Sequence, residues 1–463
     1  MKVCKFGGTS VASAEKIRQV LEIVKSDSKR RVVVVSAPGK RNAGDIKVTD
    51  LLIRMAERHL AEGQAEDELR EVVARYREIG EGLGLPNRII QQIESDLRRR
   101  LATDASHRSR FVDRLKAAGE DNCARLVAAY FNQAGLAAQY VSPATAGLVV
   151  SEEYGKARVM PESYRRLASL RQRRRVVVFP GFFGLSRDGD IVTFSRGGSD
   201  ITGAILAAAV KAEVYENFTD VDSVFAASPH FVDNPVSIPS LTYREMRELA
   251  YAGFAIFHDE ALEPVLRAGV PVCVKNTNNP KASGTWIVPE RQEAPGTVVG
   301  IAGDSGFCSI YVSKYLMNRE IGFGRRLLQI LEENGLSYEH MPSGIDNVSV
   351  ILREAQFDSE VEGRVIARIR RELEADAVEV ERNLALVMIV GEGMQHTPGI
   401  ASRATTALAR AGINIEMINQ GSSEVSMMFG VKAKDLRGAV RALYEEFFGN
   451  IKCTRGFRSN RAS

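Results

Sequence analysis

A pattern of strand-like and helix-like segments that occurs twice in the last third of the sequence most constrains the fold. Both copies follow the order β-α-β-β-α, and each takes about 60 to 80 residues. A unit of this size leaves open sheet edges, so we expect the two copies, or copies from two chains, to pair side by side. The expected segments are 307–312, 323–333, 335–339, 347–352 and 361–373 in the first copy, and 384–390, 399–411, 412–418, 424–431 and 436–447 in the second.

The first 290 residues alternate between strands and helices. Runs of β-branched residues at 32–35 and 176–179 are each followed by a turn containing Pro-Gly and predict buried strands. Residues from about 50 to 138 are rich in Leu, Ala, Arg and Glu at helical spacing, which predicts an inserted helical layer. Further strands are expected at 191–194, 214–218 and 270–274, with helices at 201–211 and 259–268. The alternation predicts a mostly parallel sheet covered on both faces.

Length and composition exclude several classes of protein. The chain has 463 residues, 44% hydrophobic and 26% charged, so it is too long for one ordinary domain and too apolar for a disordered one. We expect domains at 1–290, 300–380 and 381–463. A net charge of +4 gives no electrostatic footprint for nucleic acid, and no apolar stretch suits a membrane span or signal peptide. Five scattered cysteines without CxxC spacing are interpreted as free thiols of a cytoplasmic protein.

Glycines follow two of the predicted strands at points suited to anions. The segment KFGGTS, which begins at Lys5, joins a strand to a helix, and its exposed amides and lysine suit phosphate oxygens. A plain turn is the alternative. The segment RGGSD, which begins at Arg196, adds a planar guanidinium suited to a carboxylate. Asp200 at its end could instead only cap the next helix. Two such junctions at strand ends suggest a site for two anionic ligands.

Two further acidic positions leave alternatives open. Thr219 and Asp220 follow a third strand, where the acidic group could face a nucleotide or form an ordinary Asx turn. Glu120 at a helix start could bind an ammonium group or favour the positive helix end. The sequence contains no P-loop motif and no His-Arg-Asp catalytic loop, and its six histidines are dispersed, so no metal ligand is assigned.

Three motifs, in this order, resemble those of the aspartokinases of the amino-acid kinase family. They are KFGGTSV from Lys5, RGGSD from Arg196 and TDV from Thr219. The doubled tail resembles the paired ACT regulatory domains of the same enzymes, so the resemblance covers essentially the whole chain. It implies an α/β fold with an amino-acid kinase-like, mostly parallel sheet sandwiched by helices. Two ferredoxin-like βαββαβ (ACT) regulatory units are implied to follow.

The resemblance implies transfer of the γ-phosphoryl group of ATP to the side-chain carboxylate of L-aspartate, giving 4-phospho-L-aspartate. Such a transfer needs cations and N–H donors that neutralise the moving group. Lys5 is implied to stabilise that group, and Asp200 to orient the cations of the site. Mg²⁺ is expected to arrive with ATP, held largely by phosphate oxygens and water. The other implied contacts are with phosphate from Gly7, Gly8 and Ser10, with the nucleotide from Thr219 and Asp220, and with aspartate from Thr49, Glu120, Arg196 and Ser199.

One segment departs from the family pattern. Aspartokinases usually carry Asp-Pro-Arg beyond the Thr-Asp motif, with the arginine near the ATP phosphates, but this chain has Ser228-Pro229-His230. We expect weaker ATP binding at His230 unless another cation, such as Lys275, substitutes. The alternatives to an active enzyme are an impaired paralogue that serves as an amino-acid-binding regulatory subunit, and a sibling kinase acting on glutamate or acetylglutamate.

The ACT-like copies are implied to form the allosteric sensor. In such domains an amino-acid effector, here lysine and/or threonine, binds between paired units at strand-to-helix loops. A homo-oligomer, either dimer or tetramer, is implied through the same domains. The alternative is that the copies only join two chains. The matching positions are Met317, Gly322, Ser343 and Asp346 in the first copy, and Thr397, Gly399 and Ile400 in the second.

Overall fold

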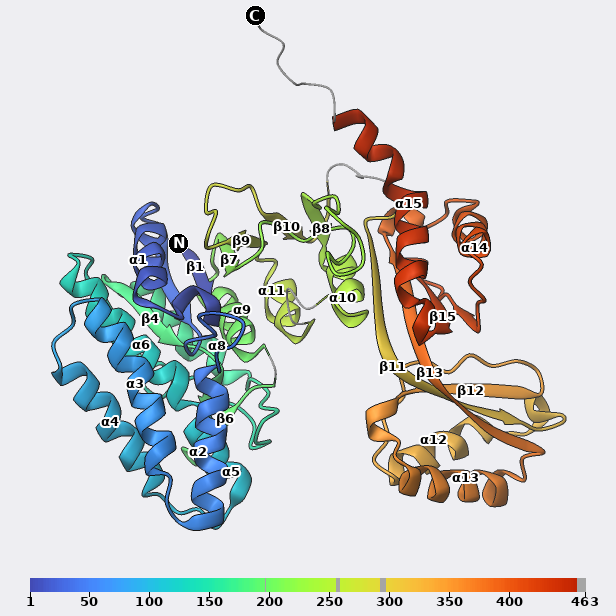
Figure 1. The fold of residues 1–463 in the computed structure, drawn as a ribbon, viewed down its shortest axis with the longest axis horizontal. Coiled ribbons are helices and arrows are strands. Elements are labelled where there is room, and N and C mark those ends of the chain that lie inside the picture. Colours follow the sequence, from blue (N-terminus) through green and yellow to red (C-terminus); the bar gives the residue numbers. More distant parts are fainter. Residues whose placement is uncertain (196, 255–258, 292–296, 456–463) are drawn as a thin grey trace, which may run out of the picture. The chain divides into compact units, whose positions relative to one another are not determined.

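The computed structural model describes residues 1–195, 197–254, 259–291 and 297–455 and divides into two compact units (Figure 1). Within these described ranges, no helix combines the length and apolar composition needed to cross a membrane. The first unit comprises Met1–Val224, Ser237–Arg247 and Ala255–Gln292, and the second comprises Phe225–Val236, Glu248–Phe254 and Glu293–Ser463.

An eight-stranded sheet forms the centre of the first unit, in the order β3-β4-β2-β1-β7-β9-β10-β8. Neighbours from β3 to β9 are parallel, whereas β10 is antiparallel to β9. The four valines at 32–35 are fully buried, as expected for a strand covered on both faces. The mostly parallel sheet is therefore confirmed. The strands are β1 (Lys2–Phe6), β2 (Arg30–Val35), β3 (Ala138–Tyr140), β4 (Val176–Pro180), β7 (Val214–Thr219), β8 (Ser240–Thr242), β9 (Val272–Asn276) and β10 (Thr285–Val288).

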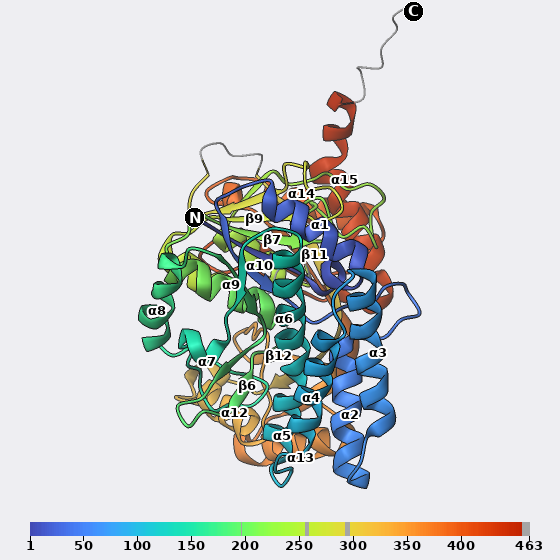
Figure 2. The ribbon, with the colours of Figure 1, turned by 90° about the vertical axis from the view of Figure 1, so that its left-hand side faces the viewer.

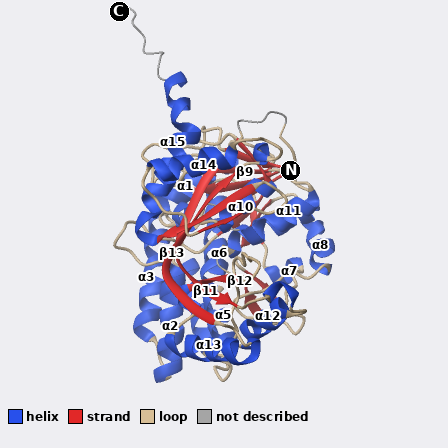
Figure 3. Ribbon diagram, turned by 90° about the vertical axis from the view of Figure 1, so that its right-hand side faces the viewer, coloured by secondary structure: helices blue, strands red, loops and turns tan. Residues whose placement is uncertain are grey.

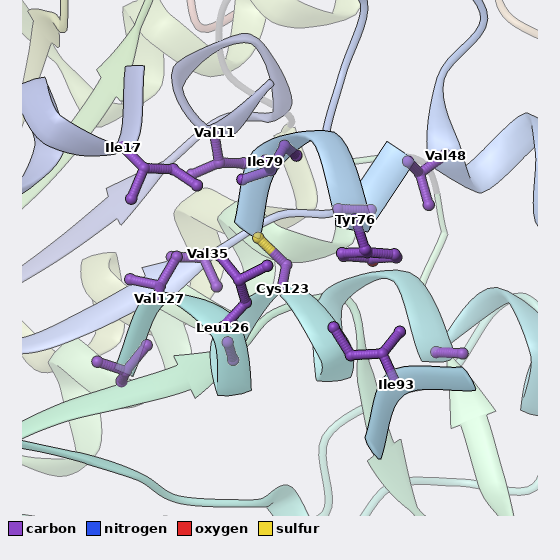
Figure 4. Close-up of a cluster of buried hydrophobic side chains, with 14 of the residues drawn as sticks. Val11, Ile17, Val35, Val48, Tyr76, Ile79, Ile93, Cys123, Leu126 and Val127 are labelled. Carbon is purple, nitrogen blue, oxygen red and sulfur yellow. The ribbon is translucent and has the colours of Figure 1, made fainter. Parts of the chain in front are cut away.

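Helices cover both faces of this sheet. On one face α6 packs against β2, β3 and β4, and the inserted helices extend outward from it (Figure 2). The core there includes Val35, Tyr76 and Leu126 (Figure 4). On the other face α9 packs against β1, β2 and β7. The helices of this half are α1 (Ala14–Lys25), α2 (Val48–Glu62), α3 (Glu66–Gly82), α4 (Arg88–Leu101), α5 (Arg108–Lys116), α6 (Ala118–Gln133), α7 (Pro143–Ala146), α8 (Glu162–Leu167) and α9 (Gly198–Ala209).

The remaining elements of this part of the chain are short. Strands β5 (Phe183–Leu185) and β6 (Ile191–Thr193) form a separate hairpin, followed later by helices α10 (Tyr243–Tyr251) and α11 (Leu262–Ala268). The sequence analysis did not predict β3, β5, β8, β10 or α10. Four of the five cysteines, Cys4, Cys123, Cys273 and Cys308, are buried free thiols. The side chain of Cys453 lies outside the described residues.

A five-stranded antiparallel sheet forms the second unit, in the order β12-β11-β13-β15-β14. The helices α12 and α13 share a hydrophobic core with the far half of β11, while α15 packs on β11, β13 and α14. The elements are β11 (Gly300–Ser313), α12 (Phe323–Glu333), β12 (Asn347–Arg353), α13 (Ser359–Leu373), β13 (Ala377–Val390), α14 (Ile400–Arg410), β14 (Met417–Asn419), β15 (Ser426–Lys432) and α15 (Leu436–Arg455).

The two copies of the repeat are joined by their long central strands. Strands β11 and β13 each run for 14 residues and pair along most of their length (Figure 3). The start of β11 pairs with the end of β13 in the second copy, and its end pairs with β12 and the start of β13 in the first. The expected side-by-side pairing is thus one continuous sheet. The segment 335–339 forms no strand and leads to an isolated bridge between His340 and Ile351.

Segment Phe225–Val236 belongs to the second unit by its packing, although the sequence analysis includes it in a domain at 1–290. Its backbone is bound by α15. Arg437 and Arg441 donate to the carbonyls of His230 and Phe231 at 3.0 and 2.6 Å, and the Tyr444 hydroxyl accepts from Val236 N–H at 2.9 Å. These contacts join residues that are about 200 positions apart in the sequence, so no local pattern could predict them.

Candidate active site

Three polar side chains meet above the carboxyl ends of β1 and β7. The Lys5 ammonium lies 2.6 Å from Asp200 Oδ1, and the Asn217 amide donates to the same oxygen at 2.9 Å. Lys5 and Asn217 stand directly opposite each other in the parallel register of β1 and β7, so their side chains share the face that α9 covers. Asp200 comes from the first turn of α9. The two predicted catalytic residues, Lys5 and Asp200, are thus brought together.

The glycine turn after β1 lies next to the Lys5 ammonium. Lys5 Nζ is so near Gly7 that an ideal Cβ there would lie 3.6 Å from it. The Gly7 N–H, however, donates to the Phe218 carbonyl at 3.1 Å, so the structure uses this amide within the sheet edge and not for a ligand. Gly8 packs against the loop after β2, where a Cβ on Gly39 would lie 2.6 Å from the Gly8 carbonyl carbon. Only glycine permits this crossing of the two loops.

A cavity of about 360 Å³ lies beside the glycine turn. Its lining includes the predicted nucleotide residues Ser10, Thr219 and Asp220. The Ser10 hydroxyl is 2.7 Å from that of Thr277, which fixes the turn to the loop after β9. A cavity of this size suits part of a small ligand. Three predicted nucleotide-binding positions therefore do line one hollow at the carboxyl ends of the strands, where ligands bind in open α/β sheets.

The cavity also contains residues that the sequence analysis missed. Lys16 lies in the first turn of α1, with Nζ bonded to Asn278 at 2.6 Å. Lys40 follows directly on the Gly39 crossing and is exposed. Because both flank strand-end turns, the rule that selected the other motifs could have found them. The missed lining residues with polar side chains are Thr9, Ser13, Glu15, Lys16, Lys40, Arg41, Thr277 and Asn278.

Glu120 is a buried carboxyl group with an incomplete set of partners. It lies in the first turn of α6 and is 5% exposed, and its Oε2 has no hydrogen-bond partner among the described residues. Burial raises the pKa of Glu120 to about 8, although a hydrogen bond from the Ala37 backbone opposes the shift. A buried acceptor without a donor is costly and suits a cationic ligand group.

The other predicted substrate residues have different environments. Ser199, in the first turn of α9, is buried and touches the Gly181 backbone, where a Cβ would lie 2.5 Å from its hydroxyl. Thr49 is half-buried in the first turn of α2. Arg196 lies outside the described residues. Its neighbour Ser195 bonds to Glu260 at 2.6 Å. Among the residues that the structure describes, no hydrogen bond or ion pair joins Thr49 or Ser199 to Lys5, so their shared role remains a prediction.

The two remaining nucleotide positions are not brought to the cavity lining. Lys275 is half-buried in β9, in register with Phe218 of β7. His230 is exposed in the second unit, and its N–H donates to the Ser228 hydroxyl at 3.3 Å. No group of three or more His, Cys, Asp or Glu side chains suited to a metal ion occurs among the residues the structure describes.

The predicted effector positions of the first copy form one linked pair of loops. Asp346 accepts the Leu316 N–H through Oδ1 at 2.8 Å, and its backbone carbonyl accepts from Lys314 at 2.9 Å. This holds Leu316 in a left-handed conformation (φ 62°) just before Met317. Gly322 precedes α12 with φ 79°, and Gly399 precedes α14 with φ 90°. Ser343 is exposed beside Asp346, while Thr397 bonds to Gly393 and Ile400 is buried.

Comparison with known proteins decides the family. The model of the amino acid kinase family matches residues 1–276, and an ACT domain model matches residues 387–447. Aspartokinase 3 of Bacillus subtilis (strain 168) is 59% identical over 97% of this chain and 99% of its own length. The chain belongs to the aspartokinases. It is therefore a phosphotransferase with a carboxyl group as acceptor, which confirms the predicted activity and favours an active enzyme over an impaired paralogue.

Solved aspartokinase structures agree with the fold. The aspartate kinase of Clostridium acetobutylicum is 37% identical, with a TM-score of 0.84 over 96% of this chain and 100% of that chain. E. coli aspartokinase III in complex with aspartate and ADP is 26% identical, with a TM-score of 0.81 over 97% and 100%. These comparisons confirm the predicted α/β fold, in which an amino acid kinase domain is followed by C-terminal ACT regulatory structure.

Proposed function

We propose that the site beside Lys5 transfers the γ-phosphoryl group of ATP to the side-chain carboxylate of L-aspartate, giving 4-phospho-L-aspartate. The observation that carries this proposal is the ion pair between buried Lys5 and half-buried Asp200, near the cavity lined by Ser10, Thr219 and Asp220. E. coli aspartokinase III, a relative of the same fold, has been solved with aspartate and ADP. Two anions must approach each other here, so fixed cations supply most of the catalysis.

Each residue acts by position and charge. Lys5 places its ammonium on the transferring group and Asp200 keeps that ammonium in place. The Gly8 amide and Ser10 contact the phosphates, and Thr219 and Asp220 face the nucleotide. Lys16 and Lys40 line the same cavity and supply positive charge that the sequence analysis sought at Lys275. Mg²⁺ would bind together with ATP, since phosphate oxygens are among its preferred ligands. It would neutralise part of the phosphate charge.

The amino-acid side of the site is held by the remaining predicted residues. Glu120 receives the ammonium group of aspartate on its unpartnered oxygen. Thr49 and Ser199 hold the amino acid, and Arg196 clamps one of its carboxylates through two parallel hydrogen bonds. A coupled assay that follows ADP formation with aspartate, glutamate and acetylglutamate tests the substrate. Activity that is highest with glutamate or acetylglutamate would refute the proposal.

His230→Arg should lower the KM for ATP by about three- to tenfold, because it restores the arginine of the family's Asp-Pro-Arg pattern, whose guanidinium can form charge-assisted hydrogen bonds to phosphate. His230 is exposed, so the longer side chain has room. Steady-state kinetics at saturating aspartate measure the effect, and His230→Gln is the control for a neutral donor. An unchanged or higher KM for ATP would show that Lys16, Lys40 or Lys275 already supplies the missing charge.

We also propose that the second unit senses lysine and/or threonine at the loops joined by Asp346. E. coli aspartokinase III has been solved with lysine and aspartate in a T-state (26% identity, TM-score 0.75). The effector binds at the N-termini of α12 and α14, each of which follows a glycine with positive φ. Effector binding biases how the sheets of the ACT units pair. The segment Phe225–Val236, which is hydrogen-bonded to α15 of the second unit, follows the Thr219 motif closely in the chain and connects the effector loops to it.

Asp346→Ala should raise the concentration of lysine or threonine for half inhibition by about tenfold or more, because Leu316 loses the acceptor that holds its strained backbone. Titrating each amino acid against turnover measures this. Asp358→Ala is the control, since the Asp358 carboxylate likewise accepts backbone N–H groups, those of Glu360 and Val361, but at the start of α13. Equal changes in both variants would indicate general loosening of the unit. A flat response of the unaltered enzyme would leave the repeats a purely structural role.

A homo-oligomer, dimer or tetramer, is supported by an apolar patch on the same loops. Tyr315, Ile321 and Ile345 are 73%, 98% and 70% exposed, and Leu316 lies between them at 43%. Exposed apolar groups gathered on hydrogen-bonded loops are typical of an interface.

We place the enzyme in the cytoplasm, which the buried free thiols support.

A further inference from the structure

Asn217 lies at the centre of the proposed catalytic pair but has no place in the family motifs. It is 1% exposed in the middle of the buried strand β7, between Glu216 and Phe218. Its register partner on β1 is Lys5. The Asn217 Nδ2 donates to Asp200 Oδ1 at 2.9 Å, and the Lys5 ammonium reaches the same atom at 2.6 Å. One carboxylate oxygen therefore takes two donors from two adjacent strands.

The other half of the Asn217 amide shows that this side chain does not serve packing. Its Oδ1 is buried without a hydrogen-bond partner among the described residues. A buried unpaired carbonyl lowers stability, so an aliphatic side chain would suit this strand position better. The hydrogen bond that the Asn217 Nδ2 group donates to Asp200 therefore explains why this position is an asparagine. Asp200 is fixed from a second direction as well, since the Tyr215 hydroxyl donates to its backbone carbonyl at 3.1 Å.

The charges of the site explain why a neutral donor is useful. When the Lys5 ammonium turns toward an anionic phosphoryl group, its bond to Asp200 weakens, and the carboxylate needs another donor to keep its position. A second lysine would itself compete for the phosphate, whereas an amide N–H holds a carboxylate without adding charge. Asn217 meets this requirement because it approaches Asp200 from the neighbouring strand.

We propose that Asn217 is a positioning residue for phosphoryl transfer, which holds Asp200 so that Lys5 stays aimed at the moving group. This rests on the proposed roles of Lys5 and Asp200. With 1% of its surface exposed, Asn217 acts through Asp200 and not by direct contact with a substrate. Loss of the Asn217 amide therefore lowers kcat, because it disturbs the alignment of Lys5 in the transition state. The KM values for ATP and aspartate stay nearly unchanged.

The test uses Asn217→Leu, Asn217→Asp and Asn217→Ser in the full chain. We expect Asn217→Leu to lower kcat by about 10- to 100-fold with both KM values within about threefold. Asn217→Asp should lose more, since a second carboxylate beside Asp200 competes for Lys5. Asn217→Ser should retain an intermediate kcat, because its hydroxyl can still donate, directly or through water. An unchanged kcat in folded Asn217→Leu, or a loss expressed mainly in KM, would overturn the inference.

A matched control lies in the helical insert. Asn122 is also fully buried, donates to a buried aspartate, Asp96, at 3.2 Å, and has an unpartnered Oδ1. Asn122→Leu should change the melting temperature by an amount similar to Asn217→Leu but keep kcat. An equal loss of kcat in both variants would assign the effect of Asn217 to general destabilisation and refute its positioning role.

A double-mutant comparison separates this inference from the proposed site. If Asn217 acts through Lys5, Asn217→Leu has no further effect on the residual turnover of Lys5→Ala. Additive losses would overturn the positioning role while leaving the function of Lys5 intact. Full turnover in Lys5→Ala alone would instead refute the proposed site, whatever Asn217 does.

Discussion

Lys5→Ala should lower kcat by about 10³-fold while the protein remains folded, because it removes the buried cation at the glycine turn. The charge on the moving phosphoryl group is greatest in the transition state, so the loss is expected mainly in kcat. Single-turnover kinetics with radiolabelled ATP would separate the chemical step from product release. The KM for aspartate should change much less than kcat.

Two control variants make this result specific. Lys5→Met keeps the length of the side chain and should be as inactive as Lys5→Ala, since the charge carries the effect. Lys29→Ala removes an exposed lysine that pairs with Glu213 at 2.8 Å and should retain full activity. Turnover close to that of the unaltered enzyme in folded Lys5→Met would mean that another cation performs the transfer.

The sequence predicted the parts of the site that depend on strand ends. The carboxyl ends of parallel strands meet at one edge of a sheet, so KFGGTS, RGGSD and TDV could be expected together without coordinates. Among the described residues, the Lys5–Asp200 contact and the cavity beside Thr219 bring members of these motifs together, while their roles in a site stay a prediction. Periodicity was equally reliable for the long helices of the insert and for α12 to α15, where amphipathic patterns extend over several turns.

What the sequence could not predict depends on contacts between distant segments. The place of Lys40 follows from the crossing of Gly8 and Gly39, which only the folded chain shows. Asn217 was passed over because a polar residue inside an apolar strand carries no local signal of its partner. The strands β3 and β8 have three residues each, too few for a period to be visible. Strand β13 spans the expected boundary at 380, and β11 and β13 each pair with strands of both copies, which no local pattern indicates.

Glu120→Gln should raise the KM for aspartate by about 100-fold at pH 8 and abolish its dependence on pH. In the ligand-free enzyme burial raises the pKa of Glu120 to about 8 from an ordinary value of 4.5, so the carboxyl is protonated at pH 7. The ammonium group of aspartate favours the ionised form. Binding therefore releases a proton, and the KM should fall by up to about tenfold per pH unit as the pH rises toward 8.

The stability of the same variant provides an independent check of the sign. The folded state holds the Glu120 proton more tightly than the unfolded state. The contribution of Glu120 to the free energy of unfolding is therefore fully present below about pH 4.5 and is lost as the pH rises through about 8. Glu120→Gln should therefore gain melting temperature over the unaltered enzyme at pH 8 but not at pH 5. Asp121→Asn, one residue along α6, breaks a 2.6 Å pair with Arg100 and should lose stability without removing the pH dependence of the aspartate KM. A KM for aspartate that stays flat from pH 6 to 8 in the unaltered enzyme would show that binding releases no proton from Glu120, and would contradict its role as the ammonium receptor.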